Sequence, residues 1–251
     1  MSEHMEPSLS LSDALTQEMA ERLEDIRGQI AHAARTAGRD PASIVLVGVS
    51  KFHSAAAAAT AVRLGLHDLG ENRVQEMLAK QDELQQAGIQ PHWHLIGTLQ
   101  KNKVKAIIGR THLIHSVDSE ELLAEIDRRS QAAGLVTDVL IQVNASAEVS
   151  KHGFDLDDPE PLLDAFRRFR KLTGVRLRGL MTMAPIVEVP VDARPYFETT
   201  ARLFQKIGQE IVEDSAFDCL SMGMSHDFSE AIACGATHVR IGTAIFGRRQ
   251  P

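Results

Sequence analysis

The stretch Ile44-Val45-Leu46-Val47-Gly48-Val49-Ser50-Lys51 decides the fold. Apart from Gly48, residues 44–49 are aliphatic and mostly β-branched, and no polar residue alternates with them. Such a run predicts a strand buried on both faces, as in a parallel sheet covered by helices. Ligands of such sheets bind at the carboxyl ends of the strands, so the run delivers Lys51 to the mouth of a candidate site.

Lys51 is the first candidate functional residue. An apolar strand behind its amine removes water from it and favours the uncharged, nucleophilic form that Schiff-base chemistry needs. The alternative is an ordinary solvated lysine that happens to follow a strand. This one strand does not decide between the two.

The rest of the chain repeats a unit of one strand and one helix. Apolar runs predict eight strands, at residues 44–50, 67–69, 92–96, 113–117, 139–143, 175–181, 219–222 and 238–241. Helices are predicted at residues 54–66, 74–87, 118–133 with Asp118 as the cap, 162–172, 193–212 and 227–234, with another around residues 101–105. Strict alternation at this length predicts an α/β fold, a single (β/α)8 TIM barrel.

An extra helix is predicted at residues 12–37, before the first strand. Apolar residues recur there at steps of three and four, and Gly38 and Pro41 end the pattern. A barrel has a helix after its last strand, and residues 243–251 are too few for a full one, so we expect the extra helix to cover that gap. The division we predict is a flexible N-terminus at residues 1–11 and one barrel domain at residues 12–251.

Composition and charge argue against several classes of protein. A net charge of −7 over 251 residues argues against nucleic acid as the main partner, because phosphate binding needs a basic surface. Cys219 and Cys234 lie far from any CxxC spacing, which favours a reducing compartment over a disulfide framework. Met1–Ser12 lacks the apolar core of a secretory signal, and no run approaches the roughly eighteen apolar residues of a membrane span. We therefore expect a cytoplasmic protein without a membrane partner.

The last two strands predict an anion site. The seventh opens into Ser221-Met222-Gly223-Met224-Ser225, and the eighth into Arg240-Ile241-Gly242-Thr243. Glycines with neighbouring hydroxyl groups between a strand and a helix expose backbone N–H groups, and barrels commonly hold phosphate in these two loops. The alternative is that Gly223 and Gly242 only turn the chain. The presence of both loops at the expected place favours a phosphate-bearing ligand.

Arg240 is predicted to point into the barrel. By strand alternation it shares a face with His238 and Gly242, while Val239 and Ile241 face the helices. A buried guanidinium needs a partner. That partner is either a ring nitrogen or phosphate of the ligand, or a buried carboxylate.

Several motifs, taken in order along the chain, resemble one known family. They are Val47-Gly48-Val49-Ser50-Lys51, Gly70-Glu71-Asn72, His92-Trp93-His94-Leu95-Ile96-Gly97, Leu99-Gln100-Lys101-Asn102-Lys103, Gly179-Leu180-Met181, Leu220-Ser221-Met222-Gly223-Met224-Ser225 and residues 239–247, Val-Arg-Ile-Gly-Thr-Ala-Ile-Phe-Gly. Together they resemble the pyridoxal phosphate homeostasis protein family, formerly called the proline synthase co-transcribed family. The resemblance runs from the N-terminal helix to Gly247.

The resemblance implies a lone barrel of the alanine racemase N-terminal domain type that binds pyridoxal 5′-phosphate (PLP). On matching positions, it implies that Lys51 forms the internal aldimine, that Arg240 approaches the pyridine nitrogen, and that Asn72 lies near the ring. The residues implied around the phosphate are Ser221, Ser225, Gly242 and Thr243. The sequence departs from many relatives at Arg73, where they carry an aromatic residue.

Two classes of function follow. A cation beside the pyridine nitrogen disfavours its protonation and makes the ring a poorer electron sink. The resemblance implies that racemases offset this with a tyrosine from an additional domain, whereas the single tyrosine here, Tyr196, falls in a predicted helix. This favours a non-catalytic protein that buffers PLP or delivers it to PLP-dependent apo-enzymes. The alternative is an amino-acid racemase or lyase that uses the same lysine.

Other polar residues have weaker claims to function. His92 and His94 form a His-x-His pair of the kind found in barrel metal sites, but no HExxH motif accompanies them, so core or supporting roles are expected and no metal. The lysines at 101, 103 and 105 form a guide for anions, a contact for a partner, or a solvated helix face. Lys151 is either a second amine near the mouth or a surface lysine.

Overall fold

The computed structural model describes residues 9–145, 153–156, 158–212 and 214–248, and its strands form a closed parallel barrel. The order around the barrel is β4-β3-β2-β1-β9-β8-β7-β5, and β5 pairs back with β4. The strands are β1 (Val45–Val49), β2 (Asp68–Glu71), β3 (His92–Leu95), β4 (Leu113–Val117), β5 (Thr137–Asn144), β7 (Val175–Thr182), β8 (Cys219–Met224) and β9 (His238–Ile241). The predicted (β/α)8 TIM barrel is confirmed.

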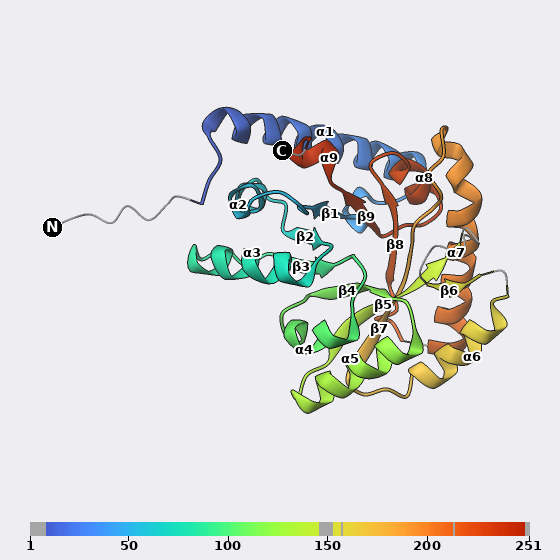
Figure 1. The fold of residues 1–251 in the computed structure, drawn as a ribbon. Helices are drawn as coiled ribbons and strands as arrows, with labels where there is room; N and C mark the ends of the chain where they lie inside the picture. Colours follow the sequence, from blue (N-terminus) through green and yellow to red (C-terminus); the bar gives the residue numbers. More distant parts are fainter. Residues whose placement is uncertain (1–8, 146–152, 157, 213, 249–251) are drawn as a thin grey trace.

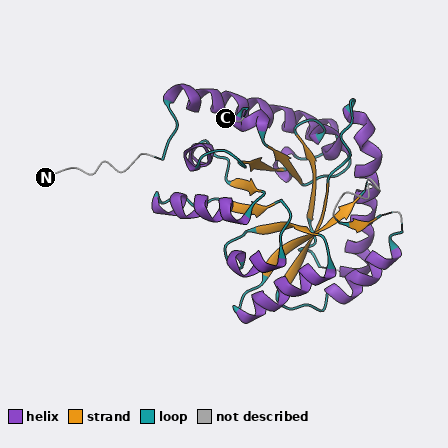
Figure 2. Cartoon of the chain, viewed as in Figure 1, coloured by secondary structure: helices purple, strands orange, loops and turns teal. Residues whose placement is uncertain are grey.

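Helices surround the strands on the outside of the barrel (Figure 1, Figure 2). They are α1 (Asp13–Thr36), α2 (Ala55–Arg63), α3 (Val74–Gln86), α4 (Val104–Ile107), α5 (Glu120–Ala132), α6 (Glu160–Phe169), α7 (Arg194–Ile207), α8 (Phe228–Ala233) and α9 (Thr243–Phe246). Short turns lie at η1 (Pro41–Ser43), η2 (Lys101–Lys103), η3 (Pro190–Ala193) and η4 (Gly208–Val212). The sequence did not predict β6 (Phe154–Asp155), which pairs with the end of β5.

The extra helix α1 covers the barrel where the last helix is short. Ser12 caps it by accepting a hydrogen bond from the N–H of Leu15, and it ends at Thr36 before Gly38, whose φ is +68°. Its buried stripe, which includes Met19, Leu23, Ile26 and Ile30, packs against α8 and α9. Figure 1 shows α1 lying across both of them, as predicted.

Smaller features refine the predictions. The hydroxyl of Ser119, not Asp118, caps α5 by accepting from the N–H of Leu122, because the helix begins one residue later than predicted. Just before α1, the carbonyl of Leu9 accepts from Arg63 and the N–H of Leu11 donates to Thr60, so both residues contact α2. Among the described residues, no helix combines the length and the apolar character that crossing a membrane requires.

Gly97 lets two chain segments meet at the carboxyl end of the barrel. It follows β3, and a Cβ atom added there would collide with the carbonyl oxygen of Asn72 and lie 2.7 Å from its Cα. Backbone cannot move aside as a flexible side chain can. The glycine therefore fixes the position of Asn72, the residue after β2.

We expect Gly97→Ala to lower the free energy of unfolding by about 1–3 kcal/mol, because the added methyl group overpacks this contact. The matched control is Gly28→Ala in the exposed middle of α1, where a Cβ would meet nothing within 4 Å. It should raise the free energy of unfolding by up to about 1 kcal/mol, as alanine is the better helix former. Urea denaturation measures both, and equal stability of the two variants would contradict the packing argument.

Candidate functional site

The predicted site residues come together along one arc of the barrel rim. Strands β8, β9, β1 and β2 are neighbours in that order and run parallel. Gly48 of β1 pairs with Ile241 of β9, so the chain after β1 lies beside the chain after β9. The residues that follow these strands therefore share the carboxyl rim: Ser225, Gly242, Thr243, Lys51 and Asn72.

Lys51 stands at the centre of this arc. It begins the turn after β1, directly after the buried Ser50, whose N–H donates to the carbonyl of Gly70 on β2 (3.1 Å). Its side chain is half-buried, and its Nζ has no hydrogen bond or ion pair with any described residue. The turn therefore presents a primary amine without a partner at the mouth of the barrel.

A buried ion cluster supports the residues on both sides of Lys51. Lys80 of α3 donates from Nζ to the carbonyl of Ser50 (2.8 Å), to Glu71 at the end of β2 (2.6 Å) and to Glu76 of α3 (2.9 Å). Burial raises the pKa of Glu71, although hydrogen bonds from Lys80 and Ser50 oppose the shift. The cluster ties the end of β1 to β2 and α3.

Phe52 is the other neighbour of Lys51, and its backbone is unusual. Its φ is +65°, which L-residues adopt rarely, and its N–H donates to Glu76 (2.6 Å). Arg73 lies over its ring, with the guanidinium carbon 5.7 Å from the ring centroid. Arg73 thus packs on the turn that carries Lys51.

The two glycine segments belong to the neighbouring strands β8 and β9, and the one after β9 lies beside the turn that carries Lys51, whereas Gly223 lies within β8. Gly223 has a φ of +92°, and Asp227 holds the next turn by accepting from the N–H of Met224 (2.6 Å). Gly242 precedes α9, and its carbonyl accepts from the N–H groups of Ile245 and Phe246. The N–H groups of the first residues of a helix have no partner within it. Ser225 and Thr243 are exposed at the rim.

Arg240 lies inside the barrel, as predicted. Its side chain is buried and donates to Ser221 Oγ (2.6 Å) and to the carbonyl of Thr182 (2.9 Å). Burial lowers its pKa to about 10. No carboxylate of the described residues accepts a hydrogen bond from this guanidinium, although the negative charge of the buried Asp227 attracts it and favours its charged form. Ser221 lies with Arg240 in the interior and apart from the exposed Ser225.

Comparisons with known proteins identify the family. The sequence matches the family described as "Alanine racemase, N-terminal domain" over residues 16–250. It is 42% identical over 230 residues to the pyridoxal phosphate homeostasis protein of Aquifex aeolicus, which covers 92% of this chain and 98% of that one. The protein of the same name from Pseudomonas aeruginosa is 40% identical over 233 residues, covering 92% and 96%. The chain belongs to the pyridoxal phosphate homeostasis protein family.

Solved structures agree with this membership. PipY of Synechococcus elongatus PCC7942, described with PLP bound, is 34% identical with a TM-score of 0.77, covering 91% of this chain and 100% of that one. An unknown protein from Bifidobacterium adolescentis has a TM-score of 0.85 at 32% identity, covering 94% and 97%. Alanine racemase of Clostridium difficile 630 has a TM-score of 0.66 at 17% identity, covering 91% and 57%, and shares the fold.

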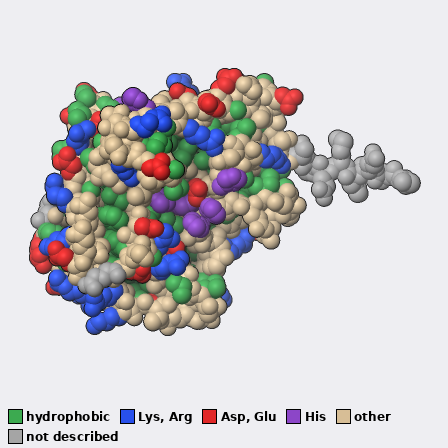
Figure 3. All heavy atoms as spheres, turned by 180° about the vertical axis from the view of Figure 1, so that it is seen from behind, with side chains coloured by type: hydrophobic (Ala, Val, Ile, Leu, Met, Phe, Trp, Pro, Cys, Tyr) green, Lys and Arg blue, Asp and Glu red, His purple; other side chains and the backbone are tan. Residues whose placement is uncertain are grey.

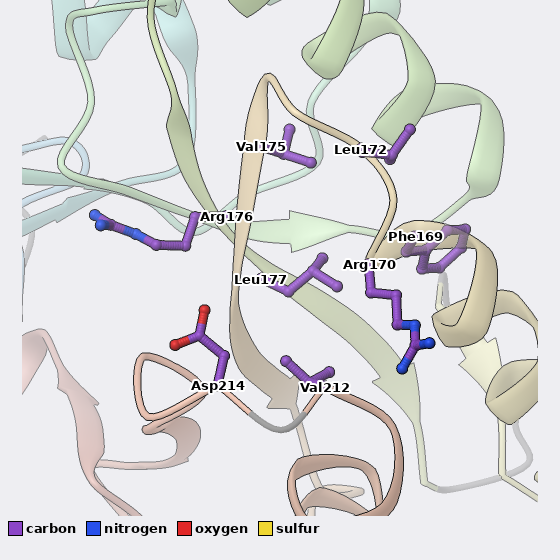
Figure 4. A pocket seen from close by; sticks show the side chains of 8 residues that line it. All are labelled: Phe169, Arg170, Leu172, Val175, Arg176, Leu177, Val212 and Asp214. Atoms are coloured by element: carbon purple, nitrogen blue, oxygen red, sulfur yellow. The ribbon is translucent and has the colours of Figure 1, made fainter.

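A cleft elsewhere on this homeostasis-family barrel is not a competing site. It lies at the opposite, amino end of β7, between α6 and the segment after α7 (Figure 4). Its two arginines point to opposite sides of the strand (Figure 4). Arg170 already donates to the carbonyl of Ile211, and Arg176 already pairs with Asp138. Arg176 is therefore paired with a carboxylate, and Arg170 is held by a backbone carbonyl.

Histidines occupy the barrel interior and its amino end. His94 and His115 are buried, and histidine side chains also gather near the centre of the face in Figure 3. His92 is exposed and hydrogen-bonds to Asp68. Among the described residues, no group of three or more histidine, cysteine or acidic side chains is arranged to hold a metal ion. Burial lowers the pKa of His115 well below 6.5 and that of His238 to about 3.

Sequence reasoning missed the residues that support the site. Lys80 and Asp68 were not singled out, because their contacts with Glu71 and His94 join residues on different helices and strands. The one local signal was the spacing of Glu76 and Lys80, four residues apart on one helix face. Lys151 lies outside the described residues.

The buried ion cluster of Lys80, Glu71 and Glu76 can be tested by removing its cation. Lys80→Met removes the only cation among the described residues that pairs with Glu71 and Glu76, and it leaves a buried carboxylate uncompensated. We expect it to lower the free energy of unfolding by about 3–5 kcal/mol. Adding Glu71→Gln should recover part of the loss, whereas Lys105→Met, at an exposed position of α4, should stay within about 0.5 kcal/mol of the parent. Additive losses in the double variant would show that the pair is not coupled.

The second prediction concerns pH. Unfolded histidines take up a proton near pH 6.5, whereas His115 and His238 stay neutral in the folded state well below that value. The unfolded state then binds more protons, so the free energy of unfolding falls as pH decreases below about 6.5, by about 1.4 kcal/mol per pH unit for each histidine. Urea denaturation between pH 7.5 and 5 measures the slope. His238→Asn should reduce the slope of the free energy of unfolding against pH by about 1.4 kcal/mol per pH unit. The change His32→Asn, at an exposed position, should leave the slope unchanged.

Proposed function

We propose that this protein binds PLP covalently through Lys51 and serves to buffer or deliver the cofactor. The observation that carries the proposal is the unpartnered amine of Lys51 on the rim between β9 and β2. An aldehyde-bearing cofactor needs such an amine, and its phosphate needs backbone N–H groups nearby. Membership of the pyridoxal phosphate homeostasis family, with the PLP-bound PipY among the related structures, supports the same conclusion.

The remaining candidates divide by the part of the cofactor they would hold. Ser225, Gly242 and Thr243 supply hydroxyl and backbone N–H donors for the phosphate. Arg240 still has N–H groups beyond the two that bond inside the barrel, and these suit an unprotonated pyridine nitrogen. Asn72, whose backbone packs closely against Gly97, would lie near the ring. The sequence also predicted Ser221 near the phosphate. Its hydroxyl instead accepts a hydrogen bond from Arg240, so Ser221 would influence the pyridine ring through that arginine.

A carrier is favoured over a racemase by the chemistry of the rim. An arginine at the ring nitrogen keeps it unprotonated, which weakens the ring as an electron sink. Racemisation also needs a second acid or base opposite the lysine. The single tyrosine, Tyr196, lies in the first turn of α7 and packs against the hydrophobic core. We propose PLP-dependent apo-enzymes of the cytoplasm as the recipients.

The test is direct. We expect PLP added to the purified protein to survive dialysis and to give a visible absorbance band. Borohydride reduction followed by peptide mass spectrometry should then place the cofactor on Lys51. Lys51→Ala should lose the band and the adduct, while Lys101→Ala, an exposed lysine on the same rim, should keep both. An adduct that persists without Lys51, or none in the parent, would refute the proposal.

Catalysis is tested separately. The PLP-loaded protein is incubated with L- and D-amino acids, and the products are resolved by chiral chromatography. We expect no sustained turnover, and we expect the cofactor to pass to an added PLP-dependent apo-enzyme. Continued racemisation or cleavage that depends on Lys51 would replace the carrier by an enzyme of the same fold.

A further inference from the structure

A line of hydrogen bonds crosses the barrel interior from Arg240 to Asp68. Arg240 donates to Ser221 Oγ (2.6 Å), and Ser221 Oγ lies 2.9 Å from His115 Nδ1. His115 Nε2 lies 2.8 Å from His94 Nδ1, and His94 Nε2 lies 3.0 Å from Asp68 Oδ1. The three middle residues are 0–1% exposed, so water cannot replace these contacts.

Chemistry at the Asp68 end fixes the direction of the line. Bonds to His94 and His92 outweigh burial and lower the pKa of Asp68, so it is a carboxylate and can only accept. His94 must then donate from Nε2, which leaves its Nδ1 as an acceptor when the ring is neutral. His115 in turn donates from Nε2 to His94 and accepts at Nδ1. The hydroxyl of Ser221 is therefore the donor to His115.

Chemistry at the Arg240 end gives the same direction. A guanidinium has donors only, so Ser221 Oγ is the acceptor in that contact. Its own proton needs an acceptor, because a buried hydroxyl without one is costly. His115 Nδ1 is the acceptor within reach. Both ends thus demand one tautomer, with the proton on Nε2, at both histidines.

The line has a charge at each end. Arg240 is a buried cation that also donates to the neutral carbonyl of Thr182 and is attracted by Asp227 without a hydrogen bond to it. Asp68 begins β2 at the amino end of the barrel, away from the rim, and its side chain is 24% exposed. The aligned bonds polarise one another, so they carry the influence of the carboxylate to the guanidinium.

We propose that Asp68, His94 and His115 are positioning residues that act through Ser221 to hold Arg240 in place for a ligand ring with an uncharged nitrogen. The inference rests on the proposed function and extends it to the opposite end of the barrel. Asp68 serves as a second, more distant counter-charge in addition to Asp227, and the two histidines transmit its effect. The guanidinium is thereby fixed in orientation, with its remaining N–H groups free for the ring nitrogen.

The tautomers are tested first, on the cofactor-free protein. Histidine labelled with ¹⁵N gives long-range NMR correlations that distinguish the Nε2–H form, the Nδ1–H form and the cation, and single variants assign the signals. We expect His94 and His115 both to be neutral with the proton on Nε2. A cation or an Nδ1–H form at either position overturns the directed line, whether or not PLP binds.

The effect on the ligand is tested with Asp68→Asn, which keeps the shape but removes the charge. We expect PLP to bind roughly tenfold more weakly, about the loss of one hydrogen bond to a charged group, and its absorbance maximum to shift. The matched control is His92→Gln, which removes the exposed partner of Asp68 and leaves the line intact. It should match the parent in affinity and spectrum. Circular dichroism confirms that both variants fold.

The outcomes separate the two proposals. If the parent binds PLP on Lys51 and Asp68→Asn is unchanged in affinity and spectrum, the positioning role is wrong and the proposed function stands. If the spectrum shifts equally in His92→Gln, the effect does not travel through His94 and the role is wrong again. If the parent does not bind PLP, both the proposed function and the positioning role fail, and the NMR result still decides the direction of the bonds.

Discussion

The pairing of β1 with β9 is the contact on which the site depends. These strands belong to the first and last units of the barrel, and only ring closure makes them neighbours. The register places Val47 beside Arg240 and Gly48 beside Ile241, so the turn with Lys51 lies next to the Gly242 loop. An amine and a set of backbone N–H groups from opposite ends of the sequence are thereby held at a fixed separation. A parallel strand shifted by one residue would turn the opposite face inward and remove Arg240 from the interior.

Strand pairing fixes where the rim residues lie, and polar networks beneath the rim fix how they are held. The Lys80 cluster fastens the residue before Lys51 through a carbonyl, and Glu76 fastens the residue after it through an N–H. The lysine itself is left without a partner among the described residues. This is the arrangement that a covalent binding site needs, because a salt bridge to the amine would have to be broken before a ligand could bind. The positive φ of Phe52 is tolerated because Glu76 and Arg73 hold that residue from two sides.

Much of this was predictable from sequence, and the limits have physical causes. The barrel, the extra helix, Lys51 at a strand end and the inward direction of Arg240 follow from periodicity and alternation, which are local properties. The partners of Arg240 did not follow. From the sequence, the expected partner of Arg240 was a ligand or a carboxylate. In the structure its hydrogen-bond acceptors are the hydroxyl of Ser221 on β8 and the carbonyl of Thr182 on β7. Such partners depend on which residues of neighbouring strands share a layer, and the irregular register between β8 and β9 cannot be read from either strand alone.

The polar interior also bears on the choice between carrier and catalyst. A hydrophobic core with one buried arginine would leave that charge without compensation, and a direct carboxylate partner would fix it in a tight pair. The proposed line of neutral residues from Ser221 to His94, which ends at Asp68, avoids both situations. It would orient the guanidinium and still leave N–H donors for a ring nitrogen. If PLP binds as proposed, an arginine so arranged would hold the ring without giving it the proton that carbanion chemistry uses. The same feature that favours firm binding therefore opposes efficient catalysis, and the amine of Lys51, supported on both sides, is suited to reversible attachment of its ligand.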